Sequence, residues 1–296
     1  MPDRRTILIA GETATGKSEL ALALAERLGG EILSVDAVAV YRGLDVGSAK
    51  PDAAARRRVA HHLLDLCDPW DGYTLGRFLE DARGALARVQ GAGRPAVLVG
   101  GTGLYARALA EGFVPPPPPS AAMRAELRDR LAREGAPALH RELSRLAPAE
   151  AARLAPGDAA RVVRALERVR EGRPPGAREP SLSLLDRLEA YVLTVPPAEL
   201  RERIRRRAEA QFDAGLLEET LAAMRRGARA LDPGLRHIGY RAAAAWCEGR
   251  IGREEALMRT VADTLSLAKR QRTYWRSVPW ATPATADEAW ARLTGT

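Results

Sequence analysis

The chain has 296 residues, of which 46% are hydrophobic and 28% are charged, enough for a large core in one or two domains. No run of 18 apolar residues occurs, so a membrane span is not expected, and Cys67 and Cys247 lie too far apart to indicate a disulfide framework or a Cys-rich zinc site. These features favour a reducing, cytoplasmic setting, and the net charge of +8 favours a polyanionic partner.

The first part of the chain alternates short apolar strands with amphipathic helices. Strands are predicted at residues 6–10, 31–35 and 96–99, and helices at 17–28 and 75–90. This alternation predicts an α/β fold with a parallel sheet flanked by helices. Ligands of such sheets bind at the carboxyl ends of the strands, where Gly11, Asp36 and Gly100 are expected.

Prolines divide the rest of the chain. The five prolines at 115–119 cannot lie in a helix interior or a central strand, and further breaks occur at 172–180. Arg- and Ala-rich helical sequence lies between them, a strand is predicted at 191–195, and helices follow from 198 to about 276. We therefore expect an α/β core made of residues 1–112 plus 191–296 and an all-helical insertion at 113–190.

Residues 11–18 form a phosphate-binding motif. The sequence Gly11-Glu12-Thr13-Ala14-Thr15-Gly16-Lys17-Ser18 matches G-x-x-x-x-G-K-[ST] between a predicted strand and a predicted helix. Backbone N–H groups of such a loop cradle phosphates, Lys17 would reach phosphate oxygens, and Ser18 would ligate a phosphate-bound Mg²⁺. A glycine-rich turn without a ligand is the alternative. The motif predicts a P-loop NTPase-like sheet and a diphosphate or triphosphate ligand, but no particular reaction.

A candidate catalytic carboxylate follows the helix of this motif. The strand at 31–35 leads into Asp36, whereas the strand at 96–99 leads into Gly100 and Gly101 and not into the Mg²⁺-binding Asp usual in an NTPase. Asp36 could therefore be a metal ligand or a general base. It could also be a simple turn or N-cap aspartate, and its position alone leaves these alternatives open.

Lysine is rare in this chain, which makes its positions informative. Only Lys17, Lys50 and Lys269 are lysines among 46 basic residues. Because arginine is used wherever either cation would serve, a retained lysine indicates a need for a compact ammonium on a flexible stem. All three lie in the segments singled out here.

Six further segments resemble the tRNA dimethylallyltransferase (tRNA isopentenyltransferase) family. They are SVDAVAVYRGLDVGSAKP at 34–51, HHLLD at 61–65, VGGTGLY at 99–105, DAARVVRALE at 158–167, IGYR at 238–241 and LAKRQRTYWR at 267–276. The family motif L-x-x-R-I-x-x-R is matched by Leu200, Arg203, Ile204 and Arg207. The order and spacing of these segments hold from about residue 6 to residue 276.

The resemblance implies a reaction and its residues. Family members transfer a dimethylallyl group from dimethylallyl diphosphate to N6 of the adenosine on the 3′ side of the anticodon in tRNA, with Mg²⁺, and release diphosphate. It implies that Asp36 is the general base, that Thr13 and Thr102 contact the substrates, and that Arg207 meets the diphosphate held by residues 11–18. The adenosine is expected to leave its stack, since N6 could not otherwise reach a buried leaving group.

The resemblance also implies the partners. They are dimethylallyl diphosphate and a tRNA anticodon stem-loop, bound by a monomer with no membrane contact, and the insertion at 113–190 is expected to grip the tRNA. Helical periodicity additionally predicts that Trp275 is a core residue. The positions implied to face tRNA are Asp36, Ala37, Val38, Ala39, Thr102, Arg161, Arg164, Arg236, Gly239, Tyr240, Arg241, Lys269, Arg270, Arg272 and Arg276.

The chain departs from the family pattern at four positions. Glu12 stands where Pro is usual, Ser18 where Thr is common, Ala37 where Ser commonly follows the aspartate, and Ala160 where Gln is usual. Glu12 adds a negative charge beside an anionic ligand, which either weakens binding or points to solvent. Ala37 and Ala160 each remove a hydrogen-bonding group from the expected nucleotide-recognition surface.

Three other functions are weighed against this one. An isopentenyltransferase acting on free AMP would not need the helical insertion or the basic charge. A small-molecule kinase would explain Lys17 and Ser18 but not the segments at 34–51 and 267–276. A non-catalytic RNA-binding module would not need Asp36 beside an intact P-loop. The pair His61 and His62 could suggest a metal site, but no further ligands lie near it in the sequence, which favours a structural or loop-contact role.

Overall fold

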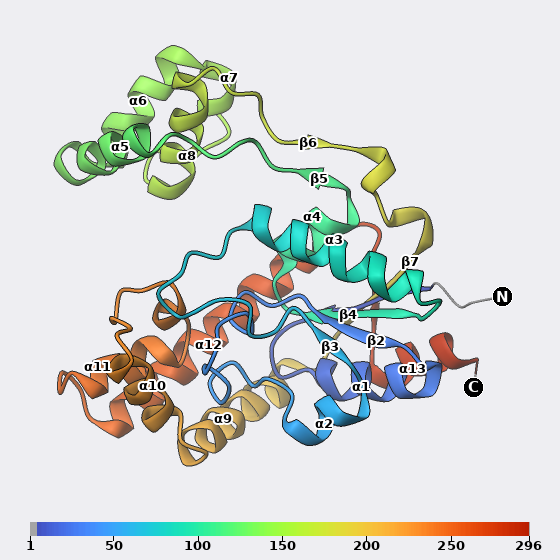
Figure 1. Ribbon diagram of the computed structural model, residues 1–296. Helices are drawn as coiled ribbons and strands as arrows, with labels where there is room; N and C mark the ends of the chain where they lie inside the picture. The colour runs from blue at the N-terminus through green and yellow to red at the C-terminus, as the bar shows by residue number, and fades with distance from the viewer. Residues whose placement is uncertain (1–4, 296) are drawn as a thin grey trace. The chain divides into compact units, whose positions relative to one another are not determined.

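Six parallel strands form the sheet that carries the phosphate motif. They lie in the order β3-β2-β4-β1-β7-β8 (Figure 1), with bounds β1 Thr6–Gly11, β2 Glu31–Ser34, β3 His61–His62, β4 Ala96–Gly100, β7 Leu188–Leu193 and β8 Thr282–Ala284. Every residue of β1 is buried, as expected for an apolar strand in the middle of a sheet covered on both faces. β1 pairs with β4 on one side and β7 on the other, so its carboxyl end lies where the strand order changes direction. The predicted α/β class is confirmed.

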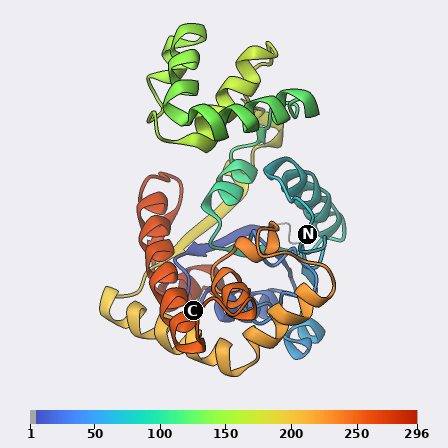
Figure 2. The same ribbon diagram turned by 90° about the vertical axis from the view of Figure 1, so that its left-hand side faces the viewer.

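Helices cover both faces of this sheet (Figures 1 and 2). α3 (Leu75–Gly91) and α4 (Gly103–Ala110) lie on one face, and α1 (Lys17–Leu28) and α13 (Ala286–Thr294) lie on the other. Leu20 and Leu24 of α1 pack against Ile7 and Ile9 of β1. A short helix, α2 (Ala53–Arg58), precedes β3.

The C-terminal helices build a second apolar cluster beside the sheet. They are α9 (Pro197–Asp213), α10 (Leu216–Arg225), α11 (Tyr240–Cys247) and α12 (Arg253–Arg276). Val40, Leu44, Leu216, Leu235 and Tyr240 are all fully buried in this cluster, which joins the loop after β2 to the helices. The 3₁₀ turns η1 (Pro180–Leu182), η2 (Leu185–Arg187) and η3 (Gly234–Arg236) complete the connections.

The chain divides into two units, Met1–Gly112 with Pro180–Thr296 and Phe113–Glu179, and the computed structural model describes residues 5–295. Residues 180–190, expected in the insertion, therefore belong to the first unit. The N–H of Leu184 donates to the carbonyl of Ala110 at 2.9 Å, and β7 begins at Leu188, which ties this stretch to the sheet. The boundary of the insertion is corrected from residue 190 to residue 179.

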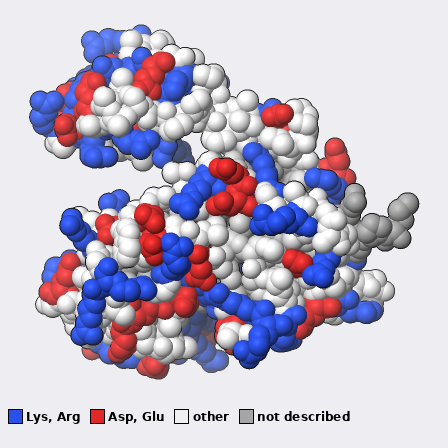
Figure 3. Space-filling view, in the orientation of Figure 1, with Lys and Arg blue, Asp and Glu red and all other residues white. Residues whose placement is uncertain are grey.

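The second unit is mostly helical. It contains α5 (Ala121–Glu134), α6 (Ala136–Leu146), α7 (Pro148–Ala151) and α8 (Ala159–Arg170), packed around Leu127, Leu139, Leu143, Val162 and Leu166. Expected to be all-helical, it also contains a two-stranded antiparallel sheet, β5 (Phe113–Val114) with β6 (Ala177–Arg178). Basic and acidic side chains are interspersed on the face of this unit seen in Figure 3. Across residues 5–295, no helix is both long and apolar enough to cross a membrane.

Candidate functional site

The phosphate motif forms a closed loop between β1 and α1. Gly11 has φ +133°, and a Cβ there would lie 2.6 Å from the carbonyl oxygen of Leu193, so a side chain is excluded. Gly16, the N-cap residue before α1, lies in the left-handed region at φ 89°. Lys17 Nζ donates to the carbonyl of Glu12 and, at 3.4 Å, to Thr15 Oγ1. The loop thus curls around its own lysine at the amino end of a helix, where an anion is favoured.

Two cations meet at this loop. Burial and the nearby Arg207 guanidinium lower the pKa of Lys17 to about 7, and burial lowers the pKa of Arg207 itself. Arg207, on α9, donates to Thr13 Oγ1 at 3.4 Å. Two partly buried like charges that lie close together favour an anion that neutralises both. The structure therefore brings Arg207 to the loop across about 190 residues of sequence, and their shared role in holding a phosphate stays a prediction.

Asp36 lies at the carboxyl end of β2 with its carboxylate fixed. Its Oδ1 accepts hydrogen bonds from the N–H groups of Val38 at 2.7 Å and Ala39 at 3.1 Å. Thr102 Oγ1 accepts from the N–H of Ala37 at 3.2 Å, which joins the β4–α4 connection to the Asp36 turn. Within residues 5–295 the Thr102 hydroxyl donates no hydrogen bond, so its hydrogen can be directed to a ligand.

The approach of these two strand ends depends on Gly100. A Cβ at Gly100 would lie 2.0 Å from the carbonyl oxygen of Val35, so even alanine would force the chains apart. The N–H of Thr102 reaches that same carbonyl at 3.4 Å. The glycine in this segment thus brings Thr102 beside Asp36.

A cavity of about 470 Å³ connects Asp36, the candidate general base, to the phosphate loop. Asp36, Thr13 and Arg207 line it together, so the structure brings the predicted carboxylate and the predicted diphosphate residues to one space. His237, which sequence reasoning did not single out, also lines the cavity, and burial lowers its pKa. A neutral imidazole at this position can donate or accept a hydrogen bond. The other lining residues are Val38, Gly47, Ser48, Ile204, Ala208, Gln211, Arg236, Ile238, Arg241, Thr260, Asp263, Thr264, Leu267 and Arg270.

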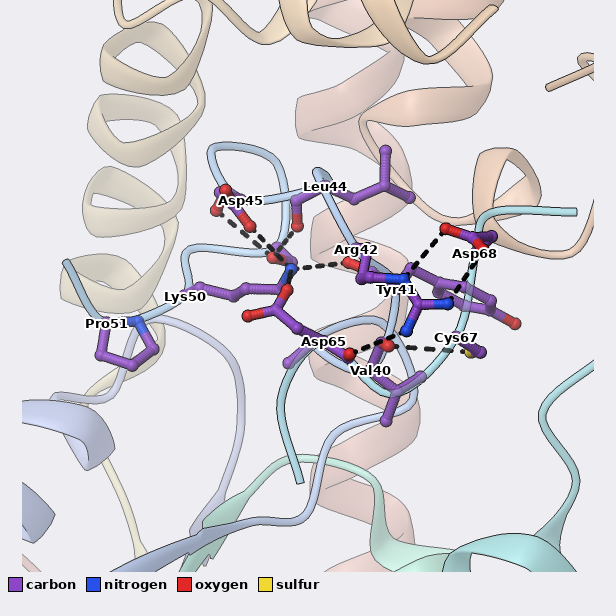
Figure 4. A network of polar contacts seen from close by, with 12 residues as sticks. Val40, Tyr41, Arg42, Leu44, Asp45, Lys50, Pro51, Asp65, Cys67 and Asp68 are labelled. Atoms are coloured by element: carbon purple, nitrogen blue, oxygen red, sulfur yellow. Dashed lines mark hydrogen bonds and ion pairs between the residues drawn. The ribbon is translucent and has the colours of Figure 1, made fainter. Parts of the chain in front are cut away.

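Lys50 holds the loop that follows Asp36 (Figure 4). Its ammonium donates to the carbonyl of Tyr41 at 2.6 Å, to Asp45 Oδ1 at 2.7 Å and to Asp65 Oδ1 at 2.6 Å. The side chain is only 1% exposed. Three acceptors around one nitrogen suit a compact ammonium better than a planar guanidinium, which explains a lysine in this arginine-rich chain. Arg56 also pairs with Asp65, at 2.8 Å.

Two neighbouring residues of α12 form hydrogen bonds with the phosphate loop. Gln271 Oε1 accepts from the N–H of Thr13 at 2.9 Å, and its Nε2 donates to the carbonyl of Gly101 at 2.9 Å. Arg272 donates to both carboxylate oxygens of Glu12, at 2.7 and 2.9 Å. Glu12 therefore does not point to solvent, and the guanidinium of Arg272, expected at the tRNA surface, is turned to the loop. Sequence reasoning missed the role of Gln271, although the residue lies inside a matched segment.

Three residues expected to face tRNA are buried. Tyr240 is 0% exposed, and its hydroxyl donates to Glu219 Oε1 at 2.7 Å and accepts from the N–H of Ser48 at 3.1 Å. Gly239 and Ala39 are buried as well. Burial counts against direct tRNA contact at these three positions, although such contact stays untested; Tyr240 bonds the loop at 45–48, and the N–H of Ala39 bonds Asp36. Trp275, 4% exposed, is the core residue that periodicity predicted.

The other expected tRNA positions remain accessible. Ala37 and Val38 are half-buried, and Arg241 forms a surface ion pair with Asp263 at 2.6 Å. On the helical unit, Arg161 and Arg164 are exposed on α8. The remaining exposed cations are Arg236, Lys269, Arg270 and Arg276.

The donors for a divalent cation are few. Within residues 5–295, no three His, Cys, Asp or Glu side chains gather as a metal site. His62 instead bonds Glu31 at 2.6 Å and His61 bonds the carbonyl of Val59 at 2.8 Å, which gives this pair a structural role at the sheet edge. Ser18 is exposed in the first turn of α1. A cation here would need ligand oxygens in addition to the hydroxyl.

Comparisons with known proteins agree with this geometry. A family model described as IPP transferase matches residues 39–278, and one described as isopentenyl transferase matches residues 4–65. The chain is 45% identical to a tRNA dimethylallyltransferase of Anaeromyxobacter dehalogenans, covering 97% of this chain and 98% of that one. It is also 45% identical to one of Halorhodospira halophila, covering 95% and 93%.

Solved structures show the same fold. The full-length tRNA isopentenylpyrophosphate transferase of Bacillus halodurans superimposes with a TM-score of 0.72 at 31% identity, over 99% of this chain and 95% of that chain. A eukaryotic dimethylallyltransferase acting on tRNA gives a TM-score of 0.76 at 21% identity, over 98% of this chain and 77% of that one.

Proposed function

The chain belongs to the IPP transferase family, and on that premise we propose that it is a tRNA dimethylallyltransferase. It transfers a dimethylallyl group from dimethylallyl diphosphate to N6 of the adenosine on the 3′ side of the tRNA anticodon. The observation that carries the proposal is the single cavity shared by Asp36, Thr13 and Arg207. Its lining combines a carboxylate with the guanidinium of Arg207 and with Thr13 of the phosphate loop. All these residues come from one chain, and we propose that the enzyme acts as a monomer.

The phosphate loop holds the diphosphate. Its backbone N–H groups and Arg207 supply positive charge before the ligand arrives, and Lys17 becomes fully charged as the diphosphate binds. The donor set fits Mg²⁺, since this ion needs only one or two protein oxygens when phosphate oxygens and water complete its shell, and the exposed Ser18 hydroxyl supplies one. When bound, the ion neutralises charge on the leaving diphosphate.

Asp36 accepts the proton of the attacking amine. Two N–H groups occupy its Oδ1, which leaves Oδ2 for the substrate. As the N6–carbon bond forms, the allylic carbon–oxygen bond breaks, the diphosphate leaves with that electron pair, and the N6 proton passes to Asp36. Thr102 donates its hydroxyl hydrogen to the substrate beside the base. An adenine amine is a poor nucleophile, so a positioned carboxylate accounts for its activation.

The tRNA is held by exposed arginines. Arg236, Arg241 and Arg270 line the same cavity as Asp36, and Lys269 and Arg276 add exposed cations on α12. Arg161 and Arg164 of the helical unit contact the RNA backbone. These cations bind phosphates without reading sequence, while the cavity receives the extruded adenine.

Label transfer from dimethylallyl diphosphate tests the proposal. Unmodified tRNA and AMP are offered in parallel with Mg²⁺, to the wild-type protein and to Asp36→Asn. Label in tRNA that Asp36→Asn abolishes is the expected result. Label in AMP alone would overturn the assignment of tRNA as acceptor, and normal transfer by Asp36→Asn would overturn the role of the base.

A further inference from the structure

A carboxylate lies inside the phosphate loop. Glu12, the second residue of the motif, is 5% exposed, and its backbone carbonyl accepts hydrogen bonds from Lys17 Nζ and, at 2.9 Å, Thr15 Oγ1. An unpaired carboxylate at this position would oppose the binding of any phosphate. The chain balances it with Arg272, whose guanidinium bonds both carboxylate oxygens at 2.7 and 2.9 Å.

This pair joins the loop to α12 across nearly the whole sequence. Glu12 and Arg272 are 260 residues apart, and the neighbouring Gln271 makes a second connection to the N–H of Thr13 at 2.9 Å. A two-point contact between guanidinium and carboxylate fixes orientation as well as distance. The charge of Arg272 is therefore neutralised by Glu12 and is not available to a phosphate in the loop.

We propose that Glu12 is a positioning residue that sets how tightly the loop holds the diphosphate, by engaging Arg272. The proposal rests on the proposed function, because it takes the ligand of the loop to be a diphosphate. The Glu12–Arg272 pair has no net charge. Removing the charge of either side chain would therefore change the charge beside the ligand by one unit. Removing the carboxylate leaves a cation beside the loop, whereas removing the guanidinium leaves a buried anion.

Opposite changes in affinity distinguish this role from a structural one. Glu12→Gln keeps the shape of the side chain and is expected to tighten the binding of inorganic pyrophosphate about tenfold, the size expected for one unit charge across partly hydrated protein. Arg272→Met is expected to weaken it by a similar factor. The double variant is expected to return the affinity to within about threefold of the wild type. Tighter product binding should also lower kcat more than kcat/KM in Glu12→Gln.

The experiment is isothermal titration of pyrophosphate at fixed Mg²⁺, with thermal unfolding measured for each variant. Because Arg272→Met leaves a buried charge and could fail to fold, Arg272→Lys is the second variant. It keeps the charge but loses the two-point contact, and an intermediate loss of affinity is expected. Arg259→Met is the control, since it removes one exposed cation of the same helix that has no part in the proposed sites. Its pyrophosphate affinity should stay within about twofold of the wild type.

The outcomes distinguish a failure of this inference from a failure of the proposed function. Opposite signs for Glu12→Gln and Arg272→Met, cancelling in the double variant, would support it. Weaker pyrophosphate binding in both single variants, with no recovery in the double variant, would mean that the pair only holds the loop in shape. That result would overturn the inference. A wild-type protein that binds no pyrophosphate would overturn the proposed phosphate site, and the inference with it.

Discussion

The protonation of Lys17 makes diphosphate binding dependent on pH. Its pKa is lowered to about 7 in the loop by burial and by Arg207, so about half of the lysines are charged at pH 7 and about one in a hundred at pH 9. A bound diphosphate favours the ammonium and returns its pKa towards the ordinary value of 10.5. Binding therefore takes up a proton above pH 7, and the affinity should fall roughly fiftyfold between pH 7 and pH 9. Well below pH 7 the lysine is already charged, and its contribution should be flat.

Titration calorimetry with pyrophosphate between pH 6 and pH 9 measures this dependence. Buffers of different ionisation enthalpy report the proton uptake directly. Pyrophosphate itself titrates in this range, so Lys17→Met provides the baseline with the same ligand. Arg207→Gln removes a cation that lowers the pKa of Lys17, so the fall should begin at a higher pH in that variant. An identical pH dependence in the wild type and in Lys17→Met would refute the reasoning.

The remaining predictions concern the base, the loop and the RNA. Asp36→Asn should lower kcat by about 10²–10⁴, with tRNA affinity in filter binding unchanged within a few-fold. Lys50→Met, which removes a buried ammonium from two partly exposed carboxylates and the carbonyl of Tyr41, should lower the free energy of unfolding in urea by about 1–3 kcal/mol, and Lys50→Arg should not restore it. Tyr240→Phe should cost about 1–2 kcal/mol in the same assay and leave tRNA affinity unchanged, whereas a specific loss of tRNA binding would reinstate it as an RNA contact. Arg161→Ala with Arg164→Ala should weaken tRNA binding and reduce its salt dependence by about 0.7 per lost phosphate contact; an unchanged slope would remove both from the interface.

The central strands and the phosphate loop were predictable from the sequence because their signals are local. β1 and β4 are apolar throughout, and the loop motif fixes its own glycines and lysine. β3 and β8 have two and three residues and carry no periodicity that a sequence could reveal. β7 starts at Leu188, three residues before the predicted start at 191. The prediction started too late because Glu189, which lies in the strand, interrupts the apolar pattern.

The directions of side chains were less predictable, since they depend on distant partners. Tyr240 lies between Gly239 and Arg241, a setting typical of a surface, yet its hydroxyl is paired with Glu219 on another helix. The sequence predicted that Glu12 either weakens the binding of an anion or points to solvent. The structure shows a third arrangement, in which Arg272 pairs with the Glu12 carboxylate. Neither partner is marked by spacing or by composition.

The helix α12 explains why substitutions close together in sequence should affect different steps. Lys269 and Arg270 are exposed, whereas Gln271 and Arg272 contact the phosphate loop, so we expect adjacent residues of one helical turn to serve different ligands. Because the helix is a rigid element, a change on its outer face alters a charge in solvent and leaves the inner hydrogen bonds in place. We therefore expect outer substitutions to change the affinity for tRNA and inner ones to change the affinity for diphosphate. A pair of substitutions, one on each face, should then act additively, and strong non-additivity would mean that RNA binding moves the loop through this helix.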